Sequence, residues 1–93
     1  MGLFYYILVD DDTPNRCKLG VTKDPEQRLR SYRTGAPQSR YLKVYKDIDR
    51  RHEKLILELL KDILRVKNEV VYGNPEMVKN HVEGYFDDQG IEY

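Results

Sequence analysis

Two runs of apolar and β-branched residues occur near the start of the chain, separated by a cluster of turn-forming residues. Residues 3–9 are almost continuously aliphatic or aromatic, and residues 16–21 form a second run that contains three apolar residues. The segment between them, residues 10–15, consists of aspartates, threonine, proline and asparagine. Short apolar runs bounded by such residues predict strands. We therefore expect a β-hairpin at the beginning of the chain.

The segment after the predicted hairpin has the start signals of a helix. Asp24 is a good N-cap, and Pro25 suits the first helical position because the backbone N–H that it lacks is not needed there. Gln27 can close a capping box. We expect this helix to run to about Thr34, with Gly35 ending it in the left-handed conformation.

Residues 40–46 alternate with the period of a strand whose two faces differ. The residues expected on one face are Tyr41, Lys43 and Tyr45, and those expected on the other are Leu42, Val44 and Lys46. Residues 66–72 are predicted to form one short extended segment. The first of these two segments is the predicted third strand of the sheet.

Two longer helices are predicted from apolar residues at helical spacing. The first follows Asp49, a predicted N-cap, and its expected core face is made of Leu55, Ile56, Leu59, Leu60, Ile63 and Leu64. The second opens at Asn74-Pro75-Glu76, and its expected core stripe is made of Met77, Val78, Val82 and Phe86. The element order β-β-α-β-α-(β)-α predicts an α+β fold, an α/β sandwich. In it a small, mostly antiparallel three-stranded sheet is flanked by helices.

Length and composition narrow the class of protein. A chain of 93 residues indicates one domain, residues 1–93, with a small core. The longest apolar run is too short to span a bilayer, and the start of the chain has no secretory pattern. The single cysteine, Cys17, is expected to be a small core residue in a reducing compartment. We therefore expect an intracellular protein, in the cytoplasm or nucleoid or in the host cell if it is viral, with no membrane partner.

Charge is unevenly distributed although the net charge is zero. Residues 1–52 carry 11 Lys and Arg against 7 Asp and Glu, whereas residues 53–93 carry 5 against 9. An asymmetry of this kind indicates a side that faces a polyanion. A helix with a solvated basic face would give the same count.

The residues of these elements resemble the GIY-YIG endonuclease superfamily over about residues 4–86. They are similar to its short branch, found in phages, viruses and bacteria, in which the second motif reads Lys-Ile-Gly. The resemblance rests on Tyr6, Lys18-Leu19-Gly20, Arg28, Glu53 and the later segment Asn68-Glu69-Val70-Val71. Neighbouring strand residues face opposite sides, so Tyr5 and Tyr6 are both candidates for the first tyrosine, and the spacing to Gly20 favours Tyr6.

The resemblance implies an enzyme that cuts DNA with one divalent ion, Mg²⁺ or Mn²⁺. The catalytic residues that it implies are Tyr6, Lys18, Arg28 and Glu53, with Glu53 as the metal ligand. The substrate-binding residues that we assign with them are Gly20, Lys23, Tyr32 and Arg33. Lys18 stands where the wider superfamily has a second tyrosine.

The chemistry of these residue types fits that assignment. The planar guanidinium of arginine binds two phosphate oxygens at once and keeps its charge. One carboxylate can hold Mg²⁺, which keeps several of its waters. A tyrosine has a pKa near 10 and becomes a useful base only when a nearby cation lowers that value; Lys18 or the network of metal-bound water can do so.

Each candidate also has a simpler explanation. The helix dipole accounts for Glu53 in a first turn, Lys18 can be an edge charge, and Tyr32 can serve packing. We expect a metal-dependent endonuclease domain that hydrolyses DNA phosphodiester bonds. The alternatives are a catalytically inactive nucleic-acid-binding module of the same fold and a protein-interaction domain. Because no zinc finger, helix-turn-helix or basic arm accompanies the domain, cutting would be unspecific or a separate targeting protein would direct it.

Overall fold

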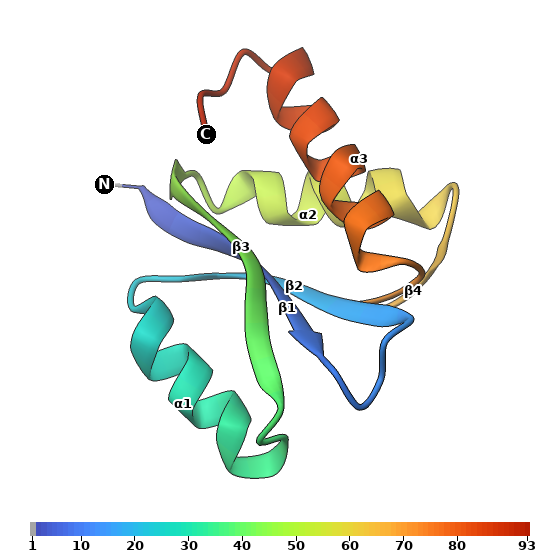
Figure 1. The fold of residues 1–93 in the computed structure, drawn as a ribbon. Coiled ribbons are helices and arrows are strands. Elements are labelled where there is room, and N and C mark those ends of the chain that lie inside the picture. Colours follow the sequence, from blue (N-terminus) through green and yellow to red (C-terminus); the bar gives the residue numbers. More distant parts are fainter. Residues whose placement is uncertain (1) are drawn as a thin grey trace.

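The computed structural model describes residues 2–93, in which five strands form one sheet with helices on both of its faces (Figure 1). The strands are β1 (Leu3–Asp10), β2 (Arg16–Thr22), β3 (Ser39–Ile48), β4 (Arg65–Lys67) and β5 (Val70–Tyr72). The helices are α1 (Pro25–Gly35), α2 (Arg51–Lys61) and α3 (Pro75–Asp88). The α+β class is confirmed, but the sheet has five strands rather than three. Within residues 2–93 no helix has the length and hydrophobicity that crossing a membrane requires.

The strands follow the order β3-β1-β2-β5-β4, and every neighbouring pair is antiparallel. The predicted hairpin of β1 and β2 therefore lies inside the sheet. The predicted extended segment at residues 66–72 is instead a second hairpin. Asn68 has a φ of 56°, in the left-handed region, and turns the chain between β4 and β5. Asparagine is one of the few residues other than glycine that adopt this conformation readily.

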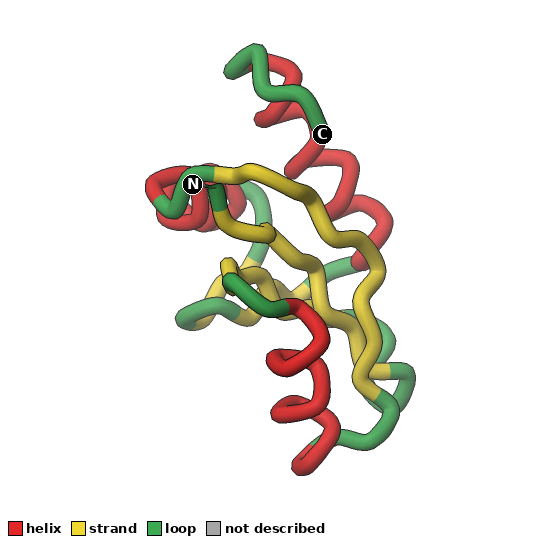
Figure 2. The backbone as a smooth tube through the Cα atoms, turned by 90° about the vertical axis from the view of Figure 1, so that its left-hand side faces the viewer, coloured by secondary structure: helices red, strands yellow, loops and turns green. Residues whose placement is uncertain are grey.

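The helices divide between the two faces of the sheet, with α2 and α3 on one and α1 on the other (Figure 2). The side chains of β1 alternate between these faces, as they must in a strand. Tyr5 belongs to the core between the sheet and α2 and α3, whereas Tyr6 contacts Tyr32 of α1. The structure thus separates the two candidate tyrosines. The buried core is made of Tyr5, Ile7, Val9, Cys17, Leu19, Val21, Tyr45, Ile48, Ile56, Leu60, Val71, Val78, Val82 and Phe86.

Aromatic rings cluster around Phe86 in this core. The ring of Phe86 lies 5.9 Å from that of Tyr5 and 5.1 Å from that of Tyr45, both edge to face. The Tyr45 hydroxyl donates a hydrogen bond of 2.7 Å to Glu83. The buried Tyr5 hydroxyl has no hydrogen-bond partner within residues 2–93. Cys17 is buried as predicted, and burial raises the pKa of its thiol to about 12.

A β-bulge changes the expected faces of β3. Ile7 of β1 pairs with Lys43 of β3, but the next residue, Leu8, pairs with Tyr41. The residue between these two partners, at position 42 of β3, therefore has no partner in β1. Tyr41 therefore faces α1, with its ring 5.3 Å from that of Tyr6. Tyr45 faces the core. The prediction that Tyr41 and Tyr45 share a face is wrong for this reason.

The helix ends differ from the sequence predictions in detail. α1 does extend to Gly35, but Ala36 is its C-cap, and Gly90 is the one glycine with positive φ in residues 2–93. Gly35 is therefore not left-handed. The N-cap of α2 is Arg50 rather than Asp49, although the Asp49 carboxylate accepts a hydrogen bond of 2.9 Å from the Arg51 N–H.

The core faces of α2 and α3 are narrower than predicted. Leu55 and Leu59 of α2 are 51 % and 43 % exposed, and Met77 of α3 is exposed as well. Ile63, which was predicted to belong to the same core face, is 52 % exposed and lies beyond the end of α2 at Lys61. The core contact of α2 is made by one stripe that includes Ile56 and Leu60. A domain of this size has too little surface to cover a broad helix face.

Phe86→Ala should lower the free energy of unfolding by about 3–5 kcal/mol, because it removes the centre of the aromatic cluster and leaves a cavity. Urea unfolding followed by circular dichroism measures this loss. Phe4→Ala is the matched control, because Phe4 is only partly buried. Equal losses in the two variants would contradict this account of the core.

Candidate functional site

A polar cleft of about 600 Å³ lies where β2 leads into α1 and faces the start of α2. Five of the residues predicted for the site line it: Tyr6, Gly20, Lys23, Arg28 and Glu53. Glu69, which belongs to the segment Asn68-Glu69-Val70-Val71 of the resemblance but was not predicted as a site residue, lines it too, as does Arg50. Lys18 and Tyr32 line an adjoining hollow of about 250 Å³.

The N-terminal cap of α1 positions Arg28. The Asp24 carboxylate accepts a hydrogen bond of 3.1 Å from the Gln27 N–H, and Pro25 occupies the first turn as predicted. The Arg28 N–H donates to the Asp24 carbonyl at 3.1 Å, within the first turns of the helix. The guanidinium therefore projects from the helix end that favours anions.

The Tyr6 ring reaches the cleft by crossing β2 at Gly20, its cross-strand partner. A Cβ atom at position 20 would lie 2.4 Å from the Tyr6 hydroxyl oxygen and 2.6 Å from the ring carbon that bears it. Only glycine leaves room for the ring. The Tyr6 hydroxyl then shares a hydrogen bond of 2.8 Å with the hydroxyl of Tyr32, which lies one helical turn after Arg28.

The surroundings of Tyr6 keep its phenol neutral near pH 7. Burial, and then the hydrogen bond to Tyr32, raise the pKa of Tyr6 far above its ordinary value. The Arg28 charge acts in the opposite direction. In this state the Tyr6 hydroxyl can donate or accept a hydrogen bond, and losing its proton requires more positive charge nearby.

Lys18 connects the two sides of the site. Its ammonium group lies 4.8 Å from the centre of the Tyr32 ring and 4.0 Å from a carboxylate oxygen of Glu69. The first contact is a cation–π interaction and the second a long ion pair. Lys18 is therefore placed to orient Tyr32 and Glu69.

Two carboxylates face the cleft from different elements. Glu53 lies in the first turn of α2, and Glu69 lies in the turn between β4 and β5. The Leu19 N–H donates a hydrogen bond of 3.0 Å to the Glu69 carbonyl, which fixes that turn against β2. Burial, and then the charge of Glu69, raise the pKa of Glu53, while Arg50 and Arg28 lower it. Two mutually repelling carboxylates in one polar space fit a divalent cation.

Arg33 does not line either hollow. Its Nε donates a hydrogen bond of 2.9 Å to the Ser39 carbonyl and so ties the end of α1 to the start of β3. The Tyr41 hydroxyl makes a similar tie at the other end of α1, donating to the Pro25 carbonyl at 2.8 Å. The structure thus gives Arg33 a contact that holds α1 in place.

In a comparison with known families, the chain matches the T5orf172 domain over residues 3–85. The assignment to the GIY-YIG endonuclease superfamily is therefore wrong, because the family model that the chain matches is a different one. A handful of motif positions in a small domain is too little to separate families. Searches of curated proteins and of solved structures found no significant match.

Glu53→Gln should raise the melting temperature at pH 7. Because the pKa of Glu53 is raised in the folded protein, the ionised side chain opposes folding once the pH exceeds its unfolded pKa. The gain should vanish below pH ~4.3, the ordinary glutamate value, where the carboxyl is protonated in both states. Thermal melts in EDTA, at pH 7 and below pH ~4.3, measure the difference without a contribution from bound metal.

Glu58→Gln is the matched control for this stability test, because Glu58 lies on an exposed part of α2 and pairs with Lys61. It should not become more stable at pH 7. A gain of the same size and pH dependence in both variants would contradict the assignment of the effect to the cleft.

Proposed function

The chain belongs to the T5orf172 domain family, and from the geometry of its cleft we propose that it is a metal-dependent endonuclease domain that hydrolyses DNA phosphodiester bonds. One observation carries the proposal: Arg28 and Tyr6 share a polar cleft with Glu53 and Glu69. Phosphodiester hydrolysis requires a cation for the phosphoryl oxygens, ligands for a metal and a group that handles a proton. Among these four side chains, Arg28 would supply the cation, Glu53 and Glu69 the metal ligands, and Tyr6 the group that handles a proton.

The cationic side of the cleft supports phosphate binding. Arg28 offers two parallel N–H donors to phosphate oxygens and remains charged at every relevant pH. Lys23 and Arg50 line the same space and increase its positive potential. Asp24 also lines it, but its carboxylate already caps α1. A phosphate beside Arg28 would therefore meet mainly cations on this side.

The acidic side of the cleft supports the cofactor. Glu53 and Glu69 would hold one Mg²⁺ or Mn²⁺ ion. When bound, such an ion polarises a phosphoryl oxygen and lowers the pKa of a water molecule. Within residues 2–93 no group of three or more His, Cys, Asp or Glu side chains is arranged to hold a metal. The pair would therefore be completed by water, as Mg²⁺ commonly is.

Tyr6 and Tyr32 would handle the proton. Their shared hydrogen bond fixes the Tyr6 hydroxyl at the edge of the cleft, where it can hold a water molecule or a phosphate oxygen. Proton loss from Tyr6 is opposed by burial and assisted by Arg28. Lys18 would act through its contacts with Tyr32 and Glu69 rather than on the substrate.

The alternative is a module of the same fold that binds nucleic acid without cutting it, and the high pKa of Tyr6 favours this reading. In either case the proposed contacts are to phosphates, which carry no sequence information. We therefore propose a separate targeting protein as a partner. The free, buried thiol of Cys17 supports an intracellular location.

Nicking of a supercoiled plasmid in Mg²⁺ tests the proposal. The parent protein should nick, and Arg28→Ala should lower the rate by about 10²-fold or more, the effect of losing one preorganised charge-stabilising group. Arg30→Ala is the matched control, because Arg30 is an exposed arginine of the same helix outside the cleft lining. It should stay within a few-fold of the parent. A parent that binds the plasmid without nicking it supports the binding module instead.

The metal assignment has its own test in calorimetric titration with Mn²⁺. Glu53→Gln and Glu69→Gln should each weaken binding by more than about tenfold, since even changes beyond the direct ligands often cost that much. Glu58→Gln should bind as the parent does. Unchanged affinity in Glu53→Gln would remove that residue from the metal site.

A further inference from the structure

The face of the sheet on which α1 lies carries a row of basic residues over β2, β5 and β4. Residues that pair across neighbouring strands have their side chains on the same face of the sheet. Arg16 of β2 pairs with Tyr72 of β5, and Tyr72 pairs with Arg65 of β4. Two residues further along each strand, on the same face, Lys18 of β2 pairs with Val70 of β5, which pairs with Lys67 of β4. Lys18 contacts Tyr32 of α1, which identifies this as the side of α1. The sheet thus presents four cationic side chains and a tyrosine beside the cleft.

Tyr72 stands between two arginines in this surface. The Arg65 guanidinium lies 4.8 Å from the centre of the Tyr72 ring. The ring also borders an open hollow of about 270 Å³, whose lining includes Pro14, Asn15 and Arg16. The Gly73 N–H donates a hydrogen bond of 2.9 Å to the Asn15 carbonyl, which holds the β1–β2 turn against β5. The flat ring of Tyr72, with an arginine on each of the two neighbouring strands, therefore lies beside an open hollow.

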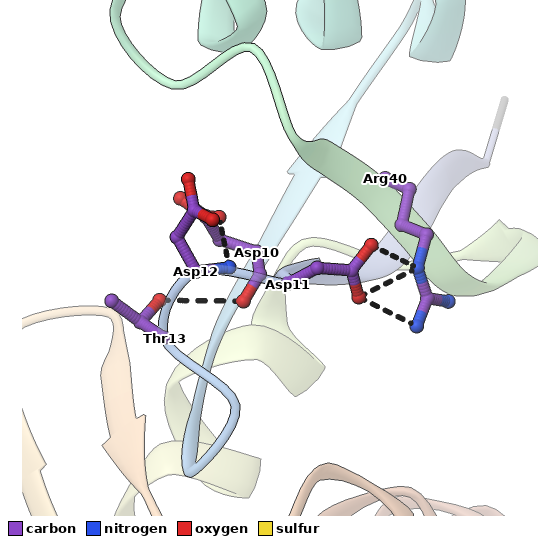
Figure 3. A network of polar contacts seen from close by, with 5 residues as sticks. All are labelled: Asp10, Asp11, Asp12, Thr13 and Arg40. Atoms are coloured by element: carbon purple, nitrogen blue, oxygen red, sulfur yellow. Dashed lines mark hydrogen bonds and ion pairs between the residues drawn. The ribbon is translucent and has the colours of Figure 1, made fainter.

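The β1–β2 turn beside this hollow is acidic. Asp11 pairs with Arg40 at 3.1 Å, and the Asp10 carboxylate accepts a hydrogen bond of 2.9 Å from the Asp12 N–H (Figure 3). These carboxylates disfavour a phosphate over the turn. Phosphates are better placed over the cations of β2 and β4, which leaves the hollow to an uncharged group.

We propose that Tyr72, with Arg16 and Arg65, is a stacking platform for an unpaired base, so that the substrate of the cleft is DNA with a single-stranded segment next to the scissile bond. This inference rests on the proposed function. Aromatic rings and guanidinium groups stack on bases of any sequence, but only on bases that have left the duplex stack. Arg16 and Gly20 are four residues apart on β2, about 13 Å. One short stretch of strand can therefore reach from the platform to the cleft.

Binding measured by fluorescence anisotropy in EDTA tests the platform without cleavage. A labelled oligothymidylate should bind Tyr72→Ala about tenfold more weakly than the parent, which is within the range for losing a stacked base. Affinity for a blunt duplex should change little. Tyr72→Phe should bind as the parent does. Tyr72→Leu keeps apolar bulk without a flat face, so it should match Tyr72→Ala and covers the case in which the alanine variant does not fold.

The arginines are tested by the salt dependence of the same binding. Arg16→Ala should weaken binding of the oligothymidylate and reduce the salt slope by about 1, because one phosphate contact is lost. Arg51→Ala removes an exposed arginine of α2, away from this surface, and should change neither quantity. Equal effects of the two variants would indicate a general charge effect and overturn the platform.

Nicking of a duplex with and without an unpaired tail separates this inference from the proposed function. The parent should prefer the tailed duplex, and Tyr72→Leu should lose the preference while still cutting the blunt duplex. If the parent binds the oligothymidylate through Tyr72 but cuts nothing, the platform stands and the nuclease proposal fails. If the parent cuts both duplexes equally and Tyr72→Leu binds the oligothymidylate as tightly as the parent, the nuclease stands and the platform is overturned.

Discussion

The close approach of the Tyr6 ring to Gly20 is the constraint on which the site depends. The ring is enclosed by Tyr32, 6.2 Å away between centroids, and by Tyr41, 5.3 Å away, so it cannot swing aside to make room for a side chain at position 20. By crossing β2 at this point the ring carries its hydroxyl to Tyr32 and joins the sheet to α1. The packing and hydrogen bonding of the site therefore require a residue without a Cβ atom, glycine, at position 20.

The predictable parts of the fold are those with local signals. The β1–β2 hairpin follows from its turn cluster, and the start of α1 follows from Asp24, whose carboxylate does cap the helix. The β4–β5 hairpin was missed because strands of three residues are too short to show alternation. The bulge in β3 was missed because it depends on pairing with β1 rather than on the sequence of β3 itself. The buried face of α2 was predicted to be too broad, because a small domain has too little other structure to cover a wide face of a helix.

The residues of the site likewise differ in whether the local sequence or only the tertiary structure identifies them. Tyr6, Gly20, Arg28 and Glu53 were assigned from motif positions, and the structure brings all four to the cleft because each lies in a strand or helix that the sequence predicts. Glu69 and Arg50 received no role because they reach the cleft through tertiary structure: Glu69 depends on the pairing of β5 with β2 and on the positive φ of Asn68. The segment Asn68-Glu69-Val70-Val71 was named for its resemblance to a family motif, and asparagine favours turns, but no role in the site was predicted for Glu69. The motif positions led to the wrong family because they define a local arrangement that different families can share.

The absence of buried residues in α1 has a consequence for how the site responds to heat. None of the residues of α1 is buried, and its ties to the sheet include three hydrogen bonds, made through Tyr32, Arg33 and the Pro25 carbonyl. Segments with few buried apolar contacts open locally at a lower free energy than the whole domain. Arg28 and Tyr32 can therefore separate from the two carboxylates while the aromatic core stays folded. Warming would therefore open the cleft before the sheet melts, and the melting temperature of the domain would overstate the range in which the site is assembled.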